Sequence, residues 1–210
     1  INDPGKRITL PLSSSPEYHN NSIKAWFTDI TNYDLALIKN FYQCGSEIVA
    51  LGSKKLLLEW TSDPKLFFRQ FDFNETGLTI APGQNLEESH RHHAQLMAIY
   101  PMGLLTPSGD SAEKRIVNNS LRWLEKMGTN NWCGYSFSWA ACIYARAKEA
   151  DNAEKMLKIF ASNFCSPNSF HLNGDQKGGQ YSSFTYRPFT LEGNFAFAQP
   201  TRITATSRLG

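Results

Sequence analysis

Residues 110–128 read DSAEKRIVNNSLRWLEKMG, and this pattern decides the fold class of the chain. Asp110 followed by Glu113 is a typical helix-capping pair, and Gly128 is a typical residue just after a helix end. Between them, apolar residues recur at helical spacing: Ile116, Val117, Leu121, Leu124 and Met127. We therefore predict an amphipathic helix that begins after Asp110 and ends at Gly128.

Two more helices follow at once. Residues 137–147 read FSWAACIYARA, which is apolar on nearly every face and predicts a helix buried on most sides. Asp151 with Glu154 repeats the capping pair ahead of a third helix. Its apolar face is formed by Ala153, Met156, Leu157, Phe160 and Phe164. Short turns separate the three helices, so we expect them to pack as antiparallel neighbours.

Upstream, a long helix is expected to begin at Thr31 or Asn32 and to end at Gly52. Its apolar positions at helical spacing are Leu37, Phe41, Cys44, Ile48 and Leu51. Shorter helical pieces are expected over residues 54–60 and after Asp63-Pro64. Polar, breaker-rich loops lie between some of these helices. The sequence thus predicts an all-α domain with its functional groups on long loops, and both a toroid of helical hairpins and an irregular bundle satisfy the pattern.

Composition narrows the possible classes of function. The chain has 210 residues, 41% of them apolar, enough for one domain with a substantial core. A net charge of +2 without a basic cluster gives no electrostatic reason to expect a nucleic-acid or membrane partner. No apolar run approaches the roughly 20 residues that cross a bilayer. Aromatic residues make up 13% of the chain, and such side chains often stack against ligands such as sugars.

Residues 88–96, ESHRHHAQL, hold three of the five histidines and an arginine. We expect Ser89 to cap a helix whose first turn is polar and whose later turn is apolar and buried. Such a polar turn at the start of a buried helix suggests a pocket, although a solvated helix start fits equally well.

His90 and His93 would share one face of that helix, which raises the question of zinc. No His-Glu-x-x-His pattern is present, and no third ligand follows from spacing. The four cysteines also lack metal-ligand spacing. We therefore expect neither a metal nor another cofactor.

Two carboxylates stand out because of their surroundings. Glu17 directly follows Pro16 in a loop, and Glu192 lies among apolar and aromatic residues. Paired carboxylates carry out glycoside hydrolysis, in which one donates a proton to the leaving oxygen and the other activates water or attacks the sugar. The chain has no Gly-x-Ser-x-Gly elbow and no glycine-rich phosphate loop.

Four stretches together resemble glycoside hydrolase family 95, the inverting α-L-fucosidases and their relatives. They are Ser15-Pro16-Glu17; His90-Arg91-His92 with Leu96 and Tyr100-Pro101; Trp139 with Ala145-Arg146; and Leu191-Glu192-Gly193-Asn194-Phe195. All four occur in the family's order.

The resemblance implies a catalytic (α/α)6 barrel, of which residues 1–199 would form the later part. The rest of the barrel and a preceding β-sandwich domain would lie outside this chain. Residues 200–210 depart from the family pattern, as a truncation or a shifted reading frame would. We expect a cut start at Ile1 and little activity from the 210 residues alone.

The resemblance also implies roles for individual residues. Glu17 would be the general acid, and Arg91 and His92 would bind the sugar hydroxyls, together with His90 and Asn194. Glu192 would stand where the family carries an aspartate that supports water-activating asparagines, and its extra methylene would displace the carboxylate by about 1 Å. The asparagine pair itself, Asn-x-Asn in the family, is not among the 210 residues.

The implied activity is inverting hydrolysis of terminal α-L-fucosides or related α-L-galactosides, with a glycan as the partner molecule. A homologue that binds carbohydrate without turnover is the alternative, motivated by Glu192 and by the tail. A helical interaction module without sugar chemistry is a third possibility. The compartment is undecided from the residues, and the resemblance implies the periplasm or the cell exterior.

Overall fold

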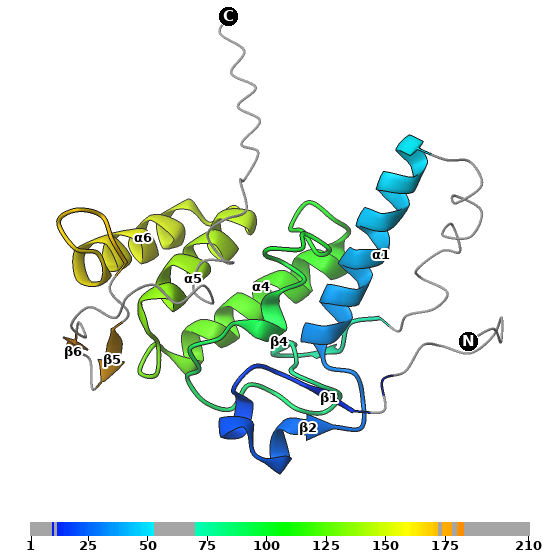
Figure 1. Ribbon diagram of the computed structural model, residues 1–210, viewed down its shortest axis with the longest axis horizontal. Helices are drawn as coiled ribbons and strands as arrows, with labels where there is room; N and C mark the ends of the chain where they lie inside the picture. The colour runs from blue at the N-terminus through cyan, green and yellow to red at the C-terminus, as the bar shows by residue number, and fades with distance from the viewer. Residues whose placement is uncertain (1–9, 11, 53–69, 172–173, 178–179, 183–210) are drawn as a thin grey trace, which may run out of the picture.

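The computed structural model describes residues 10, 12–52, 70–171, 174–177 and 180–182 (Figure 1). Four α-helices dominate this part of the chain: α1 (Asn32–Gly52), α4 (Ser111–Met127), α5 (Gly134–Arg146) and α6 (Ala150–Phe164). The strands are two or three residues long. The predicted all-α class is confirmed, and the arrangement is that of part of a helical toroid. The helical pieces expected over residues 54–60 and after Asp63 lie outside the described residues.

Helix α4 forms as its sequence predicts. The Asp110 carboxylate accepts hydrogen bonds from the backbone N–H groups of Ala112 and Glu113, each at 2.8 Å. These bonds satisfy two of the donors that a helix start leaves unpaired. The apolar face is buried through Ile116, Val117, Leu121 and Leu124.

Helices α5 and α6 form an antiparallel hairpin on one side of α4 (Figure 1). The rings of Phe137 and Phe164 stack at the end of the hairpin away from its connecting turn, with centroids 5.4 Å apart, and both side chains are fully buried. Helix α5 begins three residues before the predicted start at Phe137, because Ser136 completes a cap by accepting from the Cys133 N–H at 3.2 Å. The predicted antiparallel packing of this pair is confirmed.

The predicted cap of α6 is wrong. The chain turns at Lys148, whose φ is 65°, so that the helix already begins at Ala150 with Glu149 ahead of it. Asp151 therefore lies inside the first turn and caps nothing there. Glu154 pairs instead with Lys158, one turn later, at 2.7 Å.

Helix α1 has the predicted bounds but not the predicted packing. The Thr31 hydroxyl accepts from the Asp34 N–H at 3.2 Å and caps the helix. The buried Asn32 side chain donates to the carbonyls of Asp72 and Thr79 at 2.7 and 2.8 Å. Beyond this anchored start, the expected apolar positions Phe41, Cys44, Ile48 and Leu51 are exposed, so this face of α1 does not contribute to the core formed by the other helices.

The histidine segment is not a helix, so the predicted cap at Ser89 is wrong. The Ser89 hydroxyl accepts from the N–H of Asn131 at 3.0 Å, and the Ser89 carbonyl accepts from the Asn131 side chain at 2.8 Å. Ser89 is thus engaged by the turn before α5 rather than by its own downstream backbone. One 3-10 turn, η3 (Ala94–Leu96), follows at residue 94. The shared helix face of His90 and His93, on which zinc was considered, does not form.

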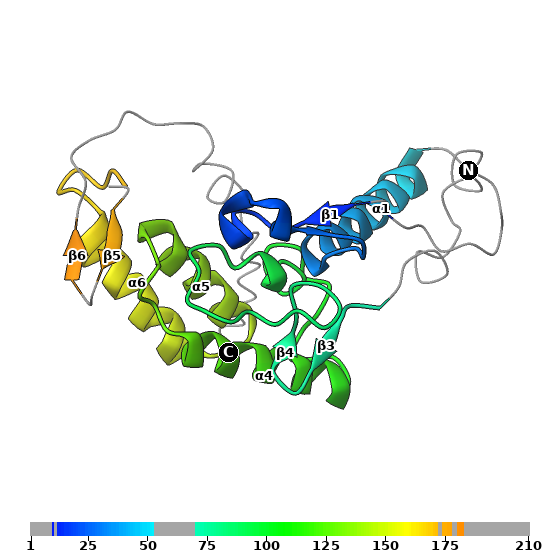
Figure 2. The ribbon, with the colours of Figure 1, turned by 90° about the horizontal axis from the view of Figure 1, so that it is seen from below.

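Short antiparallel strand pairs brace the loops. Strand β1 (Ser13–Ser14) pairs with β2 (Trp26–Phe27) around the Glu17 loop, which holds the 3-10 turns η1 (Tyr18–Asn21) and η2 (Ile23–Ala25). Strands β3 (Phe73–Asn74) and β4 (Gly77–Leu78) pair beside α4 (Figure 2). The Ser120 hydroxyl of α4 accepts from the Leu78 N–H at 2.8 Å and fixes this contact. Strands β5 (Asp175–Lys177) and β6 (Gln180–Ser182) form a third pair.

The two predicted helix caps give a matched test. Replacing Asp110 by Ala removes two capping hydrogen bonds, so we expect the free energy of unfolding to fall by about 1 kcal/mol. Asp151→Ala serves as the control, because Asp151 makes no capping bond and its loss should cost clearly less. Urea denaturation of both variants measures the difference, and equal losses would contradict the assignment of the caps.

Candidate active site

Glu17 lies on a tightly constrained loop. Its backbone is in the left-handed region, with φ 54° and ψ 8°, which costs a residue with a side chain about 1–2 kcal/mol. The turn is held by the Tyr18 N–H, which donates to the Ser15 carbonyl at 3.2 Å, and by the buried Tyr18 ring, whose hydroxyl donates to the Asn85 carbonyl at 3.2 Å. Strained conformations of this kind persist where the surroundings fix them, and they cluster at functional sites.

The Glu17 carboxylate is the centre of a cluster of basic side chains. Arg91 contacts its Oε2 atom through both Nε and a terminal guanidinium nitrogen. His92 Nε2 lies 3.0 Å from the same oxygen. Arg91 and His92 lie 74 and 75 positions after Glu17 in the sequence, and both contact the same carboxylate oxygen.

His90 holds the backbone on both sides of this contact. Its Nδ1 accepts from the His92 N–H at 3.1 Å, so its Nε2 carries the hydrogen and donates to the Glu17 carbonyl at 3.3 Å. The ring thereby fixes the distance between the Glu17 loop and the histidine segment. His90 therefore contacts backbone atoms of Glu17 and His92, and it does not contact the Glu17 carboxylate.

The first turn of α5 supports the histidine segment from below. The Ser136 hydroxyl donates to the Arg91 carbonyl at 2.7 Å, and the Tyr135 hydroxyl lies 3.1 Å from Nδ1 and 3.0 Å from Nε2 of His92. Neither residue was among the predicted site residues. The sequence feature that could have indicated them is their position at the start of the apolar helix, directly ahead of the motif residue Trp139.

Charge and burial set the protonation of the cluster. Partial burial raises the pKa of the Glu17 carboxyl, but hydrogen bonds from Arg91 and His92 outweigh that effect and hold the pKa below its ordinary value. Burial lowers the pKa of His92, and the neighbouring Glu17 carboxylate offsets only part of this. Near neutral pH the cluster is thus a carboxylate, a guanidinium and a neutral imidazole.

The cluster is open to solvent. The side chains of Glu17 and Arg91 are 39% and 46% exposed, and His92 is 22% exposed. Within the described part of the chain, no hydrogen bond engages the second carboxylate oxygen of Glu17. A molecule outside the protein can therefore reach both the carboxylate and the guanidinium.

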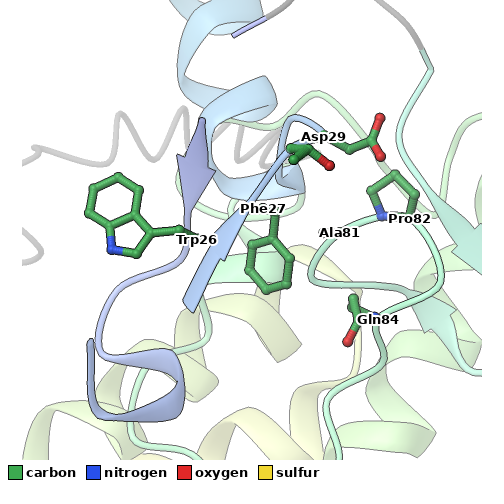
Figure 3. A pocket seen from close by; sticks show the side chains of 7 residues that line it. Trp26, Phe27, Asp29, Ala81, Pro82 and Gln84 are labelled. Atoms are coloured by element: carbon green, nitrogen blue, oxygen red, sulfur yellow. The ribbon is translucent and has the colours of Figure 1, made fainter. Parts of the chain in front are cut away.

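A separate surface hollow of about 250 Å³ lies between β2 and the turn over residues 81–84 (Figure 3). Phe27 faces this turn, whereas Trp26 points away from it. The Phe27 ring lies 6.3 Å from that of Tyr18, so one aromatic layer separates the hollow from the Glu17 loop. The hollow shares no lining residue with the Glu17 cluster.

Comparison with protein families identifies the class of the protein. The model of the glycosyl hydrolase family 95 catalytic domain matches residues 2–200. The chain therefore belongs to glycoside hydrolase family 95, and its substrate class is carbohydrate. A search of curated proteins found no match.

The structure brings together four of the predicted site residues: Glu17, His90, Arg91 and His92. Glu192 and Asn194 lie outside the described residues. Among the residues that are described, no three His, Cys, Asp or Glu side chains are grouped as metal ligands. None of the described helices has the length and apolar character to cross a bilayer.

His93 serves the site as a buried support. It is fully buried between Trp132 and Trp139, with ring centroids 4.6 and 5.4 Å away, and its Nε2 donates to the Ser136 carbonyl at 3.0 Å. Burial lowers its pKa to about 3. The neutral ring thus fixes Ser136, whose hydroxyl donates to the Arg91 carbonyl.

This burial predicts how stability depends on pH. Below its ordinary pKa of 6.5, His93 binds a proton in the unfolded chain, whereas the buried ring in the folded protein stays neutral. The contribution of His93 to the free energy of unfolding is therefore full above pH 6.5 and is lost as the pH falls toward 3. We expect His93→Gln to reduce the slope of unfolding free energy in this window by up to about 1.4 kcal/mol per pH unit. Urea denaturation at several pH values measures the slope, with the exposed His19→Asn as control. An unchanged slope in His93→Gln would contradict the buried neutral ring.

Proposed function

We propose that this chain carries the general-acid side of an inverting exo-glycosidase that acts on terminal α-L-fucosides or related α-L-galactosides. Family membership supports glycoside hydrolysis, and the resemblance of the four motifs supports this sugar class. The observation that carries the proposal is the convergence of Arg91 and His92 on Glu17, which joins a proton donor to two groups suited to sugar hydroxyls.

The reaction assigns one task to each side chain. Glu17 donates its proton to the glycosidic oxygen as the bond from that oxygen to the anomeric carbon breaks. Water attacks the same carbon from the opposite face and gives its proton to a base, so the configuration is inverted. Glu192 supports this water in the proposal, on the strength of the resemblance alone. Arg91 and His92 hold sugar hydroxyls, with His90 fixing their backbone and Asn194 contributing from the same motif as Glu192.

The low pKa of Glu17 in the free protein has to be reversed for it to act as an acid. An exposed ion pair contributes about 1 kcal/mol or less, so a sugar that hydrogen-bonds to Arg91 can displace the guanidinium from the carboxylate at small cost. The bound sugar also excludes water, which favours the neutral carboxyl. Both effects raise the pKa of Glu17 at the moment when a proton is needed.

The same low pKa favours a second candidate function. A carboxylate that stays ionised accepts hydrogen bonds from sugar hydroxyls but has no proton to donate. A homologue that binds terminal fucose or galactose without hydrolysing it would keep this geometry. The two functions differ in turnover and share the binding site.

Hydrolysis of 2-linked α-L-fucosyl galactose tests the proposal when it is measured on the full-length protein with a complete catalytic barrel, which supplies the water-activating asparagines. We expect release of the β-anomer first, seen by proton NMR, and a loss of at least about 100-fold in kcat for Glu17→Gln. Glu154→Gln is the matched control, because this exposed carboxylate pairs with Lys158 far from the cluster.

Equal turnover by wild type and Glu17→Gln would remove Glu17 as the acid. Full-length wild-type protein that binds this disaccharide, loses binding with Arg91→Ala and shows no turnover would establish the binding homologue instead. Initial release of the α-anomer would contradict inversion.

A further inference from the structure

Tyr135 has a polar contact that the proposed roles of the site residues do not include. It is the second residue of α5, and its hydroxyl lies within hydrogen-bonding distance of both ring nitrogens of His92, 3.1 Å from Nδ1 and 3.0 Å from Nε2. The two rings are tilted by 50° with centroids 5.5 Å apart. One hydroxyl hydrogen can be donated to one of these nitrogens at a time.

The neighbours of His92 decide which nitrogen accepts. Nε2 lies 3.0 Å from the Glu17 carboxylate, and an ionised carboxylate only accepts hydrogen bonds. This contact therefore favours the tautomer in which Nε2 carries the ring hydrogen. In a neutral ring this leaves Nδ1 with a lone pair, which can accept from the Tyr135 hydroxyl 3.1 Å away. Burial raises the pKa of Tyr135, so the hydroxyl keeps its hydrogen.

We propose that Tyr135 is a positioning residue that donates to Nδ1 of His92 and thereby fixes the tautomer whose Nε2–H is directed at Glu17. Without this partner only the Glu17 contact would favour the Nε2–H form, so the Nδ1–H form would gain population. In the Nδ1–H form, the lone pair of Nε2 would face the carboxylate and repel it. Tyr135 thus acts on Glu17 through His92, without touching the carboxylate.

The geometry of α5 makes this contact reproducible. Tyr135 and Ser136 are consecutive, and they hold the consecutive residues His92 and Arg91. Ser136 is fully buried and is itself fixed by His93, whose Nε2–H donates to its carbonyl at 3.0 Å. The first turn of α5 therefore holds the backbone of Arg91 and the ring of His92 beside Glu17.

Among the residues that the structure describes, the charged and titratable groups that face His92 are Glu17, Arg91, His90 and Tyr135. The Glu17 carboxylate favours the protonated ring, whereas burial and the Arg91 guanidinium favour the neutral one. A hydrogen bond donated to Nδ1 also favours the neutral ring, because it can form only when Nδ1 is unprotonated. Tyr135 therefore also helps to keep His92 neutral.

Nitrogen NMR of protein labelled with ¹⁵N-histidine tests the proposal directly, because long-range ¹H–¹⁵N spectra distinguish the two neutral tautomers. The signals of His92 are assigned by their loss in His92→Asn. We expect the Nε2–H form to dominate in the wild type and the Nδ1–H form to gain about 2- to 10-fold in Tyr135→Phe. Tyr144→Phe is the matched control: Tyr144 lies on the same helix and its hydroxyl bonds Glu125 at 3.3 Å, so His92 should not respond.

A wild-type spectrum dominated by the Nδ1–H form would overturn the proposal without any variant. So would an unchanged tautomer ratio in Tyr135→Phe, or an equal change in Tyr144→Phe. The effect on catalysis rests on the proposed glycosidase function, whereas the tautomer does not, so the two can fail separately. If hydrolysis is observed, Tyr135→Phe should lower kcat more than it changes KM and shift the pH profile, and Tyr144→Phe should do neither.

Discussion

The contact between the Glu17 carboxylate and the side chains of Arg91 and His92 is the interaction on which the site depends. It joins a strained loop near the start of the chain to a segment about 75 residues later. The ion pair itself stabilises an exposed site by little. Its importance is positional, because the carboxylate, the guanidinium and the imidazole reach one point only when both segments are held independently of it.

Each segment has its own support. The Glu17 loop is held by the β1–β2 pair, by the buried Tyr18 and by the clamp that His90 forms on the Glu17 carbonyl. The histidine segment is held by backbone and side-chain bonds from Asn131, Tyr135 and Ser136 around the start of α5. A weak ion pair between two rigid supports is well suited to a binding site, because a ligand can replace it without disturbing the fold.

Much of the fold could be predicted from the sequence, because α4, α5 and α6 combine apolar periodicity with clear ends. The errors came from turns and contacts that residue type and periodicity do not specify. Ser89 has the chemistry of a helix cap, but Asn131 engages it. Asp151 has the same chemistry, but the turn at Lys148 starts α6 two residues earlier, with Glu149 in the cap position. The apolar stripe of α1 is periodic, yet periodicity does not specify which face meets a neighbour, and Phe41, Ile48 and Leu51 are exposed.

The candidate site could likewise be predicted only in part. Glu17, His90, Arg91 and His92 could be singled out from residue type and family motifs, whereas Tyr135 and Ser136 could not, because their roles arise from the placement of α5 against the histidine segment. A carbon-detected NMR titration of the Glu17 side chain is the most direct test of the central contact. The account predicts a carboxyl pKa below the ordinary value in the wild type and a higher one in Arg91→Met, because the guanidinium stabilises the charge. A pKa at or above the ordinary value in the wild type, unmoved by Arg91→Met, would contradict it.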